Sequence, residues 1–278
     1  MSITVAQVNE LRNLTGAGIM DCKKALTESG GDIQKAIDYL RKKGAKVAEL
    51  RAGRAASEGV IIAKTTADHS RGVIVYLSCE TDFVAKNEDF RSFAAAIADV
   101  ALNQNIQSIE ALLNTSINGT SVKDQIQEKV SAIGELIAVS ALETLEGVSV
   151  VAYNHMGNKI GVLVALNHPH DEAVESAGKD VAMQVAAMNP LAVDGSGVPQ
   201  EILERERNIA REKALAQGKP EHILDKIAEG AVNTFIKENT LLTQPFVKDG
   251  SKTVAQFLGS VKSGLTVTGF KRVALGVK

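Results

Sequence analysis

An internal repeat constrains the fold of this sequence more than any other feature. The tripeptide Glu58-Gly59-Val60 and a strand-like stretch beginning at Gly72 recur as Glu146-Gly147-Val148 and a stretch beginning at Gly161. The repeated glycines are 88 and 89 positions apart, and an alanine-rich helical pattern follows each copy. A unit of two strands and a helix that occurs twice predicts an α+β protein with two related α/β halves and antiparallel strands.

The second copy of the repeat carries an insertion. Ile126 and its later counterpart Val254 are 128 positions apart, so the second copy is longer by about forty residues. The additional residues, about 199–238, show two helical patterns on either side of the turn Gly218-Lys219-Pro220, which predicts an inserted helical hairpin. Its first arm is mostly charged, so we expect the hairpin to project from the rest of the protein with only one face buried. The apolar stripe expected on its second arm consists of Ile223, Ile227, Ala231 and Phe235.

The first fifty residues predict a module of three short helices, separated by turns at 15–18 and 29–32. Asp32 is placed to cap the third helix. The inner faces are expected to consist of Val5, Val8, Leu11, Cys22, Ala25, Leu26, Ile33, Ala36, Ile37 and Leu40. Basic residues then accumulate over 41–54, opposed only by Glu49, and we interpret them as a linker. The expected division is 1–54 for the helical module with its linker, 55–140 for the first half and 141–278 for the second.

The composition favours a binding protein over an enzyme. Lys and Arg number 31 against 33 Asp and Glu, so no overall field demands a nucleic acid or a membrane as partner. Cys22 and Cys79 are the only cysteines and are expected to be reduced thiols; acidic neighbours would raise the pKa of Cys79. There is no phosphate-binding loop motif. Residues 168–172 include possible metal ligands, but polar residues are common in a loop after an apolar strand, so we expect no metal or cofactor.

No segment of the sequence predicts a transmembrane helix or a targeting signal. The longest apolar run, residues 160–166, is far shorter than the ~20 residues needed to cross a bilayer. The N-terminus lacks the pattern of a signal or transit peptide. We therefore expect a cytoplasmic protein.

The basic stretch at 41–54 supports an alternative function, an RNA-binding or ribosome-associated protein. No aromatic residue lies between Tyr39 and Tyr76, so the usual stacking platform for single-stranded RNA is missing. A third possibility is a scaffold that binds through the helical arm.

Residues 78–87 form a separate candidate site, because they connect a buried strand to a helix that contains Phe90, Phe93 and Ile97. Spacing alone favours a structural role, with Asp82 as a helix cap and Phe83 as a core anchor. An exposed functional role is the other reading of the same segment.

Two motifs resemble the signatures of the bacterial translation elongation factor Ts family. The first is Leu-Arg-Asn-Leu-Thr-Gly-Ala-Gly-Ile-Met-Asp-Cys-Lys-Lys-Ala-Leu at residues 11–26, and the second occupies residues 77–86 with Thr-Asp-Phe-Val at its centre. Shorter matches at 160–164 and 244–248 extend the resemblance over essentially the whole chain. The second motif usually opens with an acidic residue and an asparagine, where this chain has Tyr76 and Ser78.

The resemblance implies a domain arrangement and a function. It implies an N-terminal module like ubiquitin-associated domains, a core of two related halves and a protruding coiled coil. It also implies a nucleotide-exchange factor, not an enzyme, that binds elongation factor Tu in its GDP-bound and nucleotide-free states and promotes GDP release. In the family, the Thr-Asp-Phe-Val segment dislodges the partner's magnesium ion. This role carries over to Thr81, Asp82, Phe83 and Val84, and further partner contacts to Met20, Lys23, Ile133, Gly134 and His155.

Overall fold

The computed structural model describes residues 3–51 and 54–276, and three helices form its N-terminal module. They are α1 (Val5–Thr15), α2 (Ile19–Glu28) and α3 (Ile33–Arg51). Asp32 caps α3 as predicted, because its Oδ1 accepts a hydrogen bond from the Lys35 amide at 3.0 Å. The predicted inner residues are buried or partly buried in one cluster. Val5 is the exception and is exposed, so its placement on the inner face was wrong.

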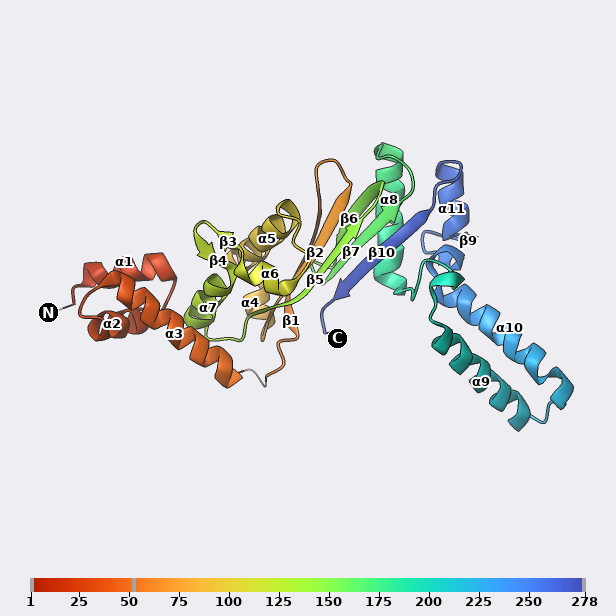
Figure 1. Ribbon diagram of the computed structural model, residues 1–278, viewed down its shortest axis with the longest axis horizontal. Coiled ribbons are helices and arrows are strands. Elements are labelled where there is room, and N and C mark those ends of the chain that lie inside the picture. Colours follow the sequence, from red (N-terminus) through yellow and green to blue (C-terminus); the bar gives the residue numbers. More distant parts are fainter. Residues whose placement is uncertain (1–2, 52–53, 277–278) are drawn as a thin grey trace.

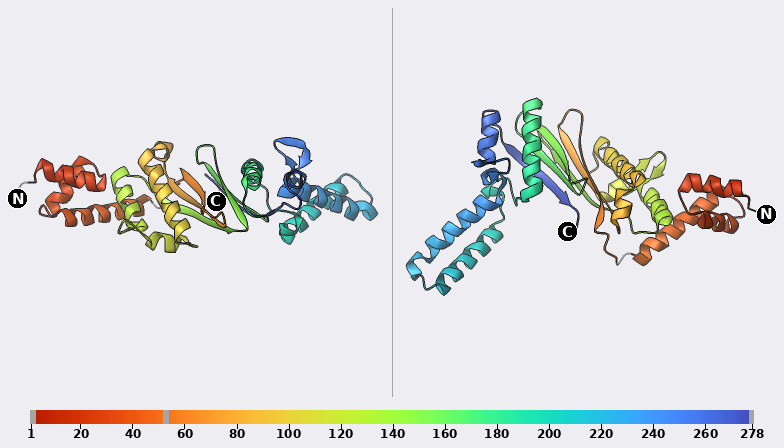
Figure 2. Two further views of the ribbon diagram at one scale, coloured as in Figure 1. Left: turned by 90° about the horizontal axis from the view of Figure 1, so that it is seen from above. Right: turned by 180° about the vertical axis from the view of Figure 1, so that it is seen from behind.

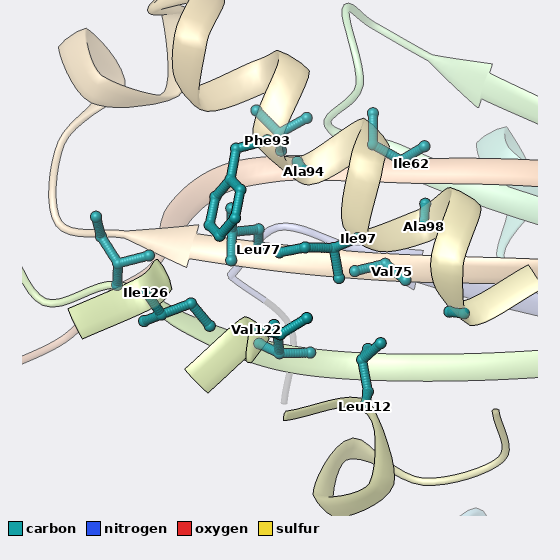
Figure 3. Close-up of a cluster of buried hydrophobic side chains, with 14 of the residues drawn as sticks. Ile62, Val75, Leu77, Phe93, Ala94, Ile97, Ala98, Leu112, Val122 and Ile126 are labelled. Carbon is teal, nitrogen blue, oxygen red and sulfur yellow. The ribbon is translucent and has the colours of Figure 1, made fainter. Parts of the chain in front are cut away.

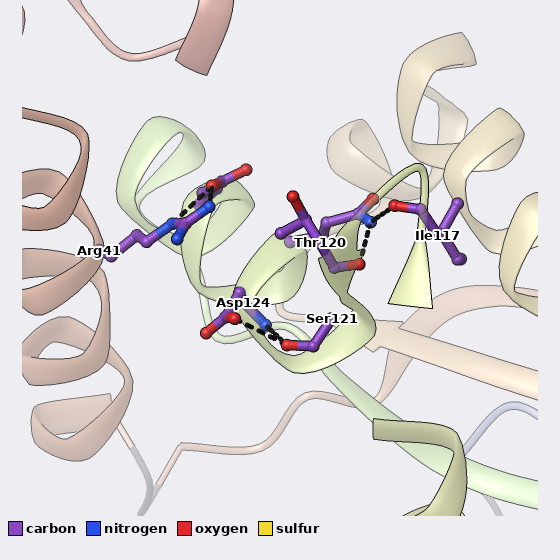
Figure 4. A network of polar contacts seen from close by, with 7 residues as sticks. Arg41, Ile117, Thr120, Ser121 and Asp124 are labelled. Carbon is purple, nitrogen blue, oxygen red and sulfur yellow. Dashed lines mark hydrogen bonds and ion pairs between the residues drawn. The ribbon is translucent and has the colours of Figure 1, made fainter. Parts of the chain in front are cut away.

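The basic stretch predicted as a linker is helical as far as Arg51 and packs on the core. Its contact is with α7 (Val122–Ile133), where Gly44 lies so close that a Cβ atom would fall 2.2 Å from the carbonyl oxygen of Gln127. Arg41 forms an ion pair with Glu128 at 2.7 Å across the same contact (Figure 4). The described part of this stretch is therefore a packed helix and not a flexible linker, while Ala52 and Gly53 lie outside the described residues.

Two three-stranded antiparallel sheets form the centre of the molecule. The first has the order β1-β2-β5, made of β1 (Glu58–Thr65), β2 (Arg71–Cys79) and β5 (Ala138–Glu146). The second has the order β10-β7-β6, made of β6 (Ser149–His155), β7 (Ile160–Leu166) and β10 (Val267–Ala274). A predicted helix covers each sheet: α5 (Glu88–Asn103) covers the first sheet and α8 (Glu172–Met188) covers the second. The repeat in the sequence thus corresponds to a repeated strand–strand–helix unit.

The two sheets pack face to face, with helices on their outer faces (Figures 1 and 2). Ile61, Ile74 and Leu163 belong to the apolar cluster between the sheets. The repeated glycines allow this approach: a Cβ atom on Gly72 would lie 2.6 Å from Leu163 Cδ2, and one on Gly161 would lie 2.6 Å from Ile61 Cγ2. Each glycine therefore faces the opposite half of the molecule.

The outer face of the first sheet carries the largest core. Figure 3 shows Val75 and Leu77 of β2 beneath Phe93 and Ile97 of α5, with Val122 of α7 closing the far side. Hydrogen bonds order the start of α7 (Figure 4). The remaining elements of this half are α4 (Asp82–Lys86), α6 (Ile109–Asn114), β3 (Ser116–Ile117) and β4 (Thr120–Ser121).

The predicted hairpin is present as α9 (Gln200–Ala216) and α10 (Glu221–Asn239), and it extends away from the sheets at the end opposite the N-terminal module (Figure 1). The buried stripe of α10 is Leu224, Ala228 and Val232, one position away from the predicted stripe, whose residues are only half-buried. Smaller elements of the second half are η1 (Gly195–Gly197), η2 (Leu241–Thr243), β8 (Pro245–Phe246), β9 (Asp249–Thr253) and α11 (Val254–Val261). Within the described ranges, no helix is both long and apolar enough to span a bilayer.

Candidate functional site

The helix α4 projects the centre of the second sequence motif from the end of β2. Thr81 caps it, with Oγ1 accepting from the Val84 amide at 3.5 Å. Asn87 ends α4 and at the same time caps α5, its Oδ1 accepting from the Phe90 amide at 3.1 Å. The chain therefore changes direction between the two helices. Phe83 is 81% exposed, whereas Phe90, just beyond the break, is 1% exposed.

These positions correct the interpretation that spacing alone favoured. Phe83 is not a core anchor, and the cap of the helix is Thr81 and not Asp82. Asp82 instead accepts a hydrogen bond from Lys86 Nζ at 2.6 Å. This bond holds the pKa of Asp82 below its ordinary value, and the positive charge of Lys159 acts in the same direction. Asp82 therefore presents a carboxylate at neutral pH.

Two glutamates tie the start of α4 to the loop between α7 and β5. Glu135 Oε2 accepts from the Glu80 and Thr81 amides at 3.1 and 3.0 Å, and its Oε1 accepts from Thr81 Oγ1 at 2.6 Å. Glu80 Oε1 reciprocates by accepting from the Leu136 amide at 2.8 Å. We refer to Glu80 and Glu135 with these bonds as the carboxylate brace. It fixes the main chain immediately before Asp82 and Phe83.

A surface hollow of about 520 Å³ lies on one side of α4. Phe83 and Val84 line it together with Ile133 at the end of α7 and Thr15 and Gly16 at the end of α1. The N-terminal module and the first half therefore share one concave, partly apolar surface around the exposed phenylalanine.

A smaller hollow of about 180 Å³ lies on the other side of α4. Asp82 and Lys86 face it with Met156 and Lys159 from the turn between β6 and β7. That turn is fixed to the first sheet, because the Ile61 amide donates to the Asn158 carbonyl at 2.9 Å. The second half of the molecule thus contributes one wall of the site.

The structure brings some of the predicted contact residues together and leaves others apart. Ile133 lines the larger hollow, and Gly134 caps α7 beside it in the left-handed conformation, with φ of 80°. His155 precedes Met156, and its Nδ1 lies 2.8 Å from the Tyr153 hydroxyl. Met20 and Lys23 are exposed on α2 but line neither hollow.

Three residues of this site were not singled out from the sequence: Glu135, Met156 and Lys159. Glu80 lay within the candidate segment 78–87, but its bond to the Leu136 amide was not foreseen. Glu80 and Glu135 act through contacts between segments 54 to 56 positions apart, which no local pattern reveals. Met156 is 67% exposed, and its place directly after His155 was the only available signal.

Other candidate chemistry has structural explanations. Cys79 is fully buried, and burial raises the pKa of its thiol to about 12, with Glu135 adding to the shift. His170 stacks on His69 with ring centroids 3.5 Å apart, and Asp171 caps α8. Among residues 3–51 and 54–276, no group of three or more His, Cys, Asp or Glu side chains could hold a metal ion.

The cations that supported the RNA-binding alternative are partly neutralised. Arg41 pairs with Glu128 at 2.7 Å, Lys43 with Asp21 at 2.6 Å, and Arg54 Nη1 with Glu80 at 3.2 Å. Paired cations contribute less to a field that would attract a phosphate backbone. The structure therefore gives this alternative no specific support.

Comparison with known proteins finds a consistent set of relatives. A family model described as "Elongation factor TS" matches residues 80–277. The chain is 53% identical over 276 residues to "Elongation factor Ts" of Amoebophilus asiaticus, which covers 99% of this chain and all of the relative. It is 49% identical over 274 residues to the protein of the same name from Christiangramia forsetii, and 46% identical over 287 residues to that from Prosthecochloris aestuarii, each with 99% of both chains covered.

Proposed function

Because the chain belongs to the elongation factor Ts family, we propose that it promotes GDP release from elongation factor Tu by inserting the exposed tip of α4 into its partner. The family consists of nucleotide-exchange factors for translation elongation, which are not enzymes. Thr81, Asp82, Phe83 and Val84 disturb the partner's magnesium site. The observation that carries this proposal is Phe83, a large aromatic side chain left 81% exposed on a short helix with both ends fixed.

Exposure of this kind has a cost that a purely structural role does not explain. An exposed phenylalanine gives up the stabilisation that burial would provide. Aromatic side chains that become fully desolvated in an interface commonly contribute more to binding than their neighbours. The hollow beside Phe83 offers a concave surface for the partner, lined by both the N-terminal module and the first half.

The mechanism is a thermodynamic linkage. If the factor and the bound GDP oppose one another on elongation factor Tu, each lowers the affinity of the other for elongation factor Tu by the same factor. Every ~1.4 kcal/mol of this coupling free energy is a tenfold change in affinity. The Asp82 carboxylate supplies a negative charge beside the phenylalanine that can compete for the magnesium ion or its ligands. The factor binds both the GDP-bound and the nucleotide-free partner, and binds the latter more tightly. Met20, Lys23, Ile133, Gly134 and His155 supply further contacts.

Release of fluorescent GDP from elongation factor Tu tests this proposal. The native factor should accelerate release, and Phe83→Ala should slow the stimulated release by roughly thirtyfold at limiting factor, since a hot spot contributes ~2 kcal/mol. Asp82→Ala should also slow it.

The matched control is Val148→Ala, which truncates an exposed apolar residue in the turn after β5. Residue 146 pairs with Arg71 at the start of β2, so this turn lies at the opposite end of the sheet from Thr81. The control should stimulate release at the native rate. A Phe83→Ala factor that does the same would refute insertion of this helix.

A further inference from the structure

The carboxylate brace is a device whose role in exchange can be derived from its geometry. α4 has only five residues, too few for a helix to be stable or fixed in direction by its own hydrogen bonds. Its orientation must therefore come from the contacts at its ends. At the C-terminal end, Arg91 Nε donates to the Ala85 carbonyl at 3.1 Å. At the N-terminal end, Glu135 holds both the main chain and the hydroxyl of the capping residue Thr81.

Glu135 is well suited to hold this end of the helix. Its two oxygens engage three donors in succession, which fixes both the position and the direction of the main chain entering α4. Bonds to an ionised acceptor are shorter and stronger than those between neutral groups. The side chain extends from the loop after α7, and Ile133 at the end of α7 lines the hollow beside Phe83. The brace thus joins the inserting helix to the opposite wall of the site.

We infer that Glu135 is a positioning residue for nucleotide exchange, which converts binding energy into distortion of the partner by preventing α4 from yielding. This inference rests on the proposed function. If α4 could rotate on meeting the partner, the factor would still bind through the N-terminal module and the rest of the surface. It would transmit less of that binding energy to the nucleotide site. Loss of Glu135 should therefore uncouple binding from exchange.

The quantity that measures this role is the ratio of two affinities of the factor, for nucleotide-free and for GDP-bound elongation factor Tu. This ratio is the coupling between factor and nucleotide. Destabilisation of the fold lowers the active fraction of factor and affects both affinities equally. A merely structural role for Glu135 would therefore leave the ratio unchanged.

Glu135→Ala removes all three acceptor contacts and should lower the ratio about tenfold, which corresponds to ~1.4 kcal/mol of coupling. Glu135→Gln should restore most of it. Its amide oxygen can accept from the two main-chain amides, and its amide nitrogen can donate to Thr81 Oγ1. If Glu135→Ala does not fold, Glu135→Asp serves instead, because the shorter side chain cannot reach all three donors. The matched control is Leu241→Ala, a fully buried residue in the second half, which should lower stability but not the ratio.

The outcomes distinguish the two proposals. An unchanged ratio in folded Glu135→Ala or Glu135→Asp, with a reduced ratio in Phe83→Ala, would overturn the role of Glu135 and leave the proposed function intact. A ratio that is native in Phe83→Ala as well would refute insertion of α4 itself. A reduced ratio in Glu135→Ala that Glu135→Gln fails to raise would also contradict the inference.

Discussion

Substituting the two repeated glycines by alanine tests the packing of the sheets. A glycine-to-alanine change at a compatible position stabilises a protein by about 0.4–1 kcal/mol, because it restricts the unfolded chain. At Gly161 the added Cβ atom would lie 2.6 Å from Ile61 Cγ2 and 3.0 Å from Ile74 Cγ2. Both neighbours are methyl groups of β-branched side chains, which are stiff and cannot turn away. Overpacking of this kind costs about 1–3 kcal/mol, and we expect Gly161→Ala to lie near the upper end.

Gly72→Ala should cost less, near the lower end of the same ~1–3 kcal/mol range. Its nearest neighbour, Leu163 Cδ2 at 2.6 Å, is the end of a flexible side chain, although Val150 Cγ1 at 3.0 Å is not. Urea unfolding followed by circular dichroism gives the free energies. The control is Gly230→Ala in α10, where nothing lies within 4 Å and the change should stabilise by about 1 kcal/mol. If Gly161→Ala were as stable as the control, the sheets could not approach as closely as described.

Four further outcomes are expected. Phe83→Ala should change the free energy of unfolding by no more than about 0.5 kcal/mol, whereas Phe90→Ala should lower it by about 3–5 kcal/mol; equal losses in urea unfolding would contradict the exposure difference. Replacement of residues 199–238 by a short Gly/Ser linker should leave a cooperative thermal transition, and its loss would show that the hairpin belongs to the core. A fragment of residues 1–54 should be helical by circular dichroism, because its helices bury their own cluster; an unstructured fragment would show that it depends on α7. Asp68 has its pKa lowered to about 2 by hydrogen bonds from Thr66 and Ser70, so its stabilising effect should be full above its ordinary value of 3.8 and disappear as the pH falls through about 2. The gap in urea midpoint between native protein and Asp68→Asn should therefore close on acidification, and a constant gap would argue against those hydrogen bonds.

The repeat made the central fold predictable, because it reported tertiary as well as local structure. The glycines at 72 and 161 stood out only as copies of one another, yet each marks a close approach of the two sheets. The insertion was equally visible, because an offset that changes between copies locates additional residues without any knowledge of their contacts. In the basic stretch, by contrast, the run of charges suggested a linker, but no residue stops α3 before Arg51, and Gly44 within it is a packing contact.

The site was less predictable, because its geometry depends on a break between two helices that the spacing of the apolar residues does not reveal. Phe83, Phe90, Phe93 and Ile97 have intervals compatible with one helical stripe, which favoured a core position for all of them. The structure ends one helix and begins the next at Asn87, so Phe83 is no longer in register with the others. The place of the segment between a strand and a helix left an exposed role open, and the resemblance to a known family favoured that role. The contacts of the brace gave no signal, since carboxylates that accept from a distant main chain leave no periodicity.

The position of the hairpin in the chain has a consequence for the entropy of closing the second sheet. In the first half Val75 pairs with Leu142, 67 positions along, and in the second half Val164 pairs with Phe270, 106 positions along. The cost of loop closure grows only as (3/2)RT ln n, so the longer connection costs about 0.4 kcal/mol more, and less if the hairpin folds first. A hairpin placed inside this connection, and not at a chain end, has both of its ends held, because the bridge between Ala192 and Thr240 brings the two ends of the insertion together. Its length can vary with little effect on the stability of the two paired strands that flank it in the sequence.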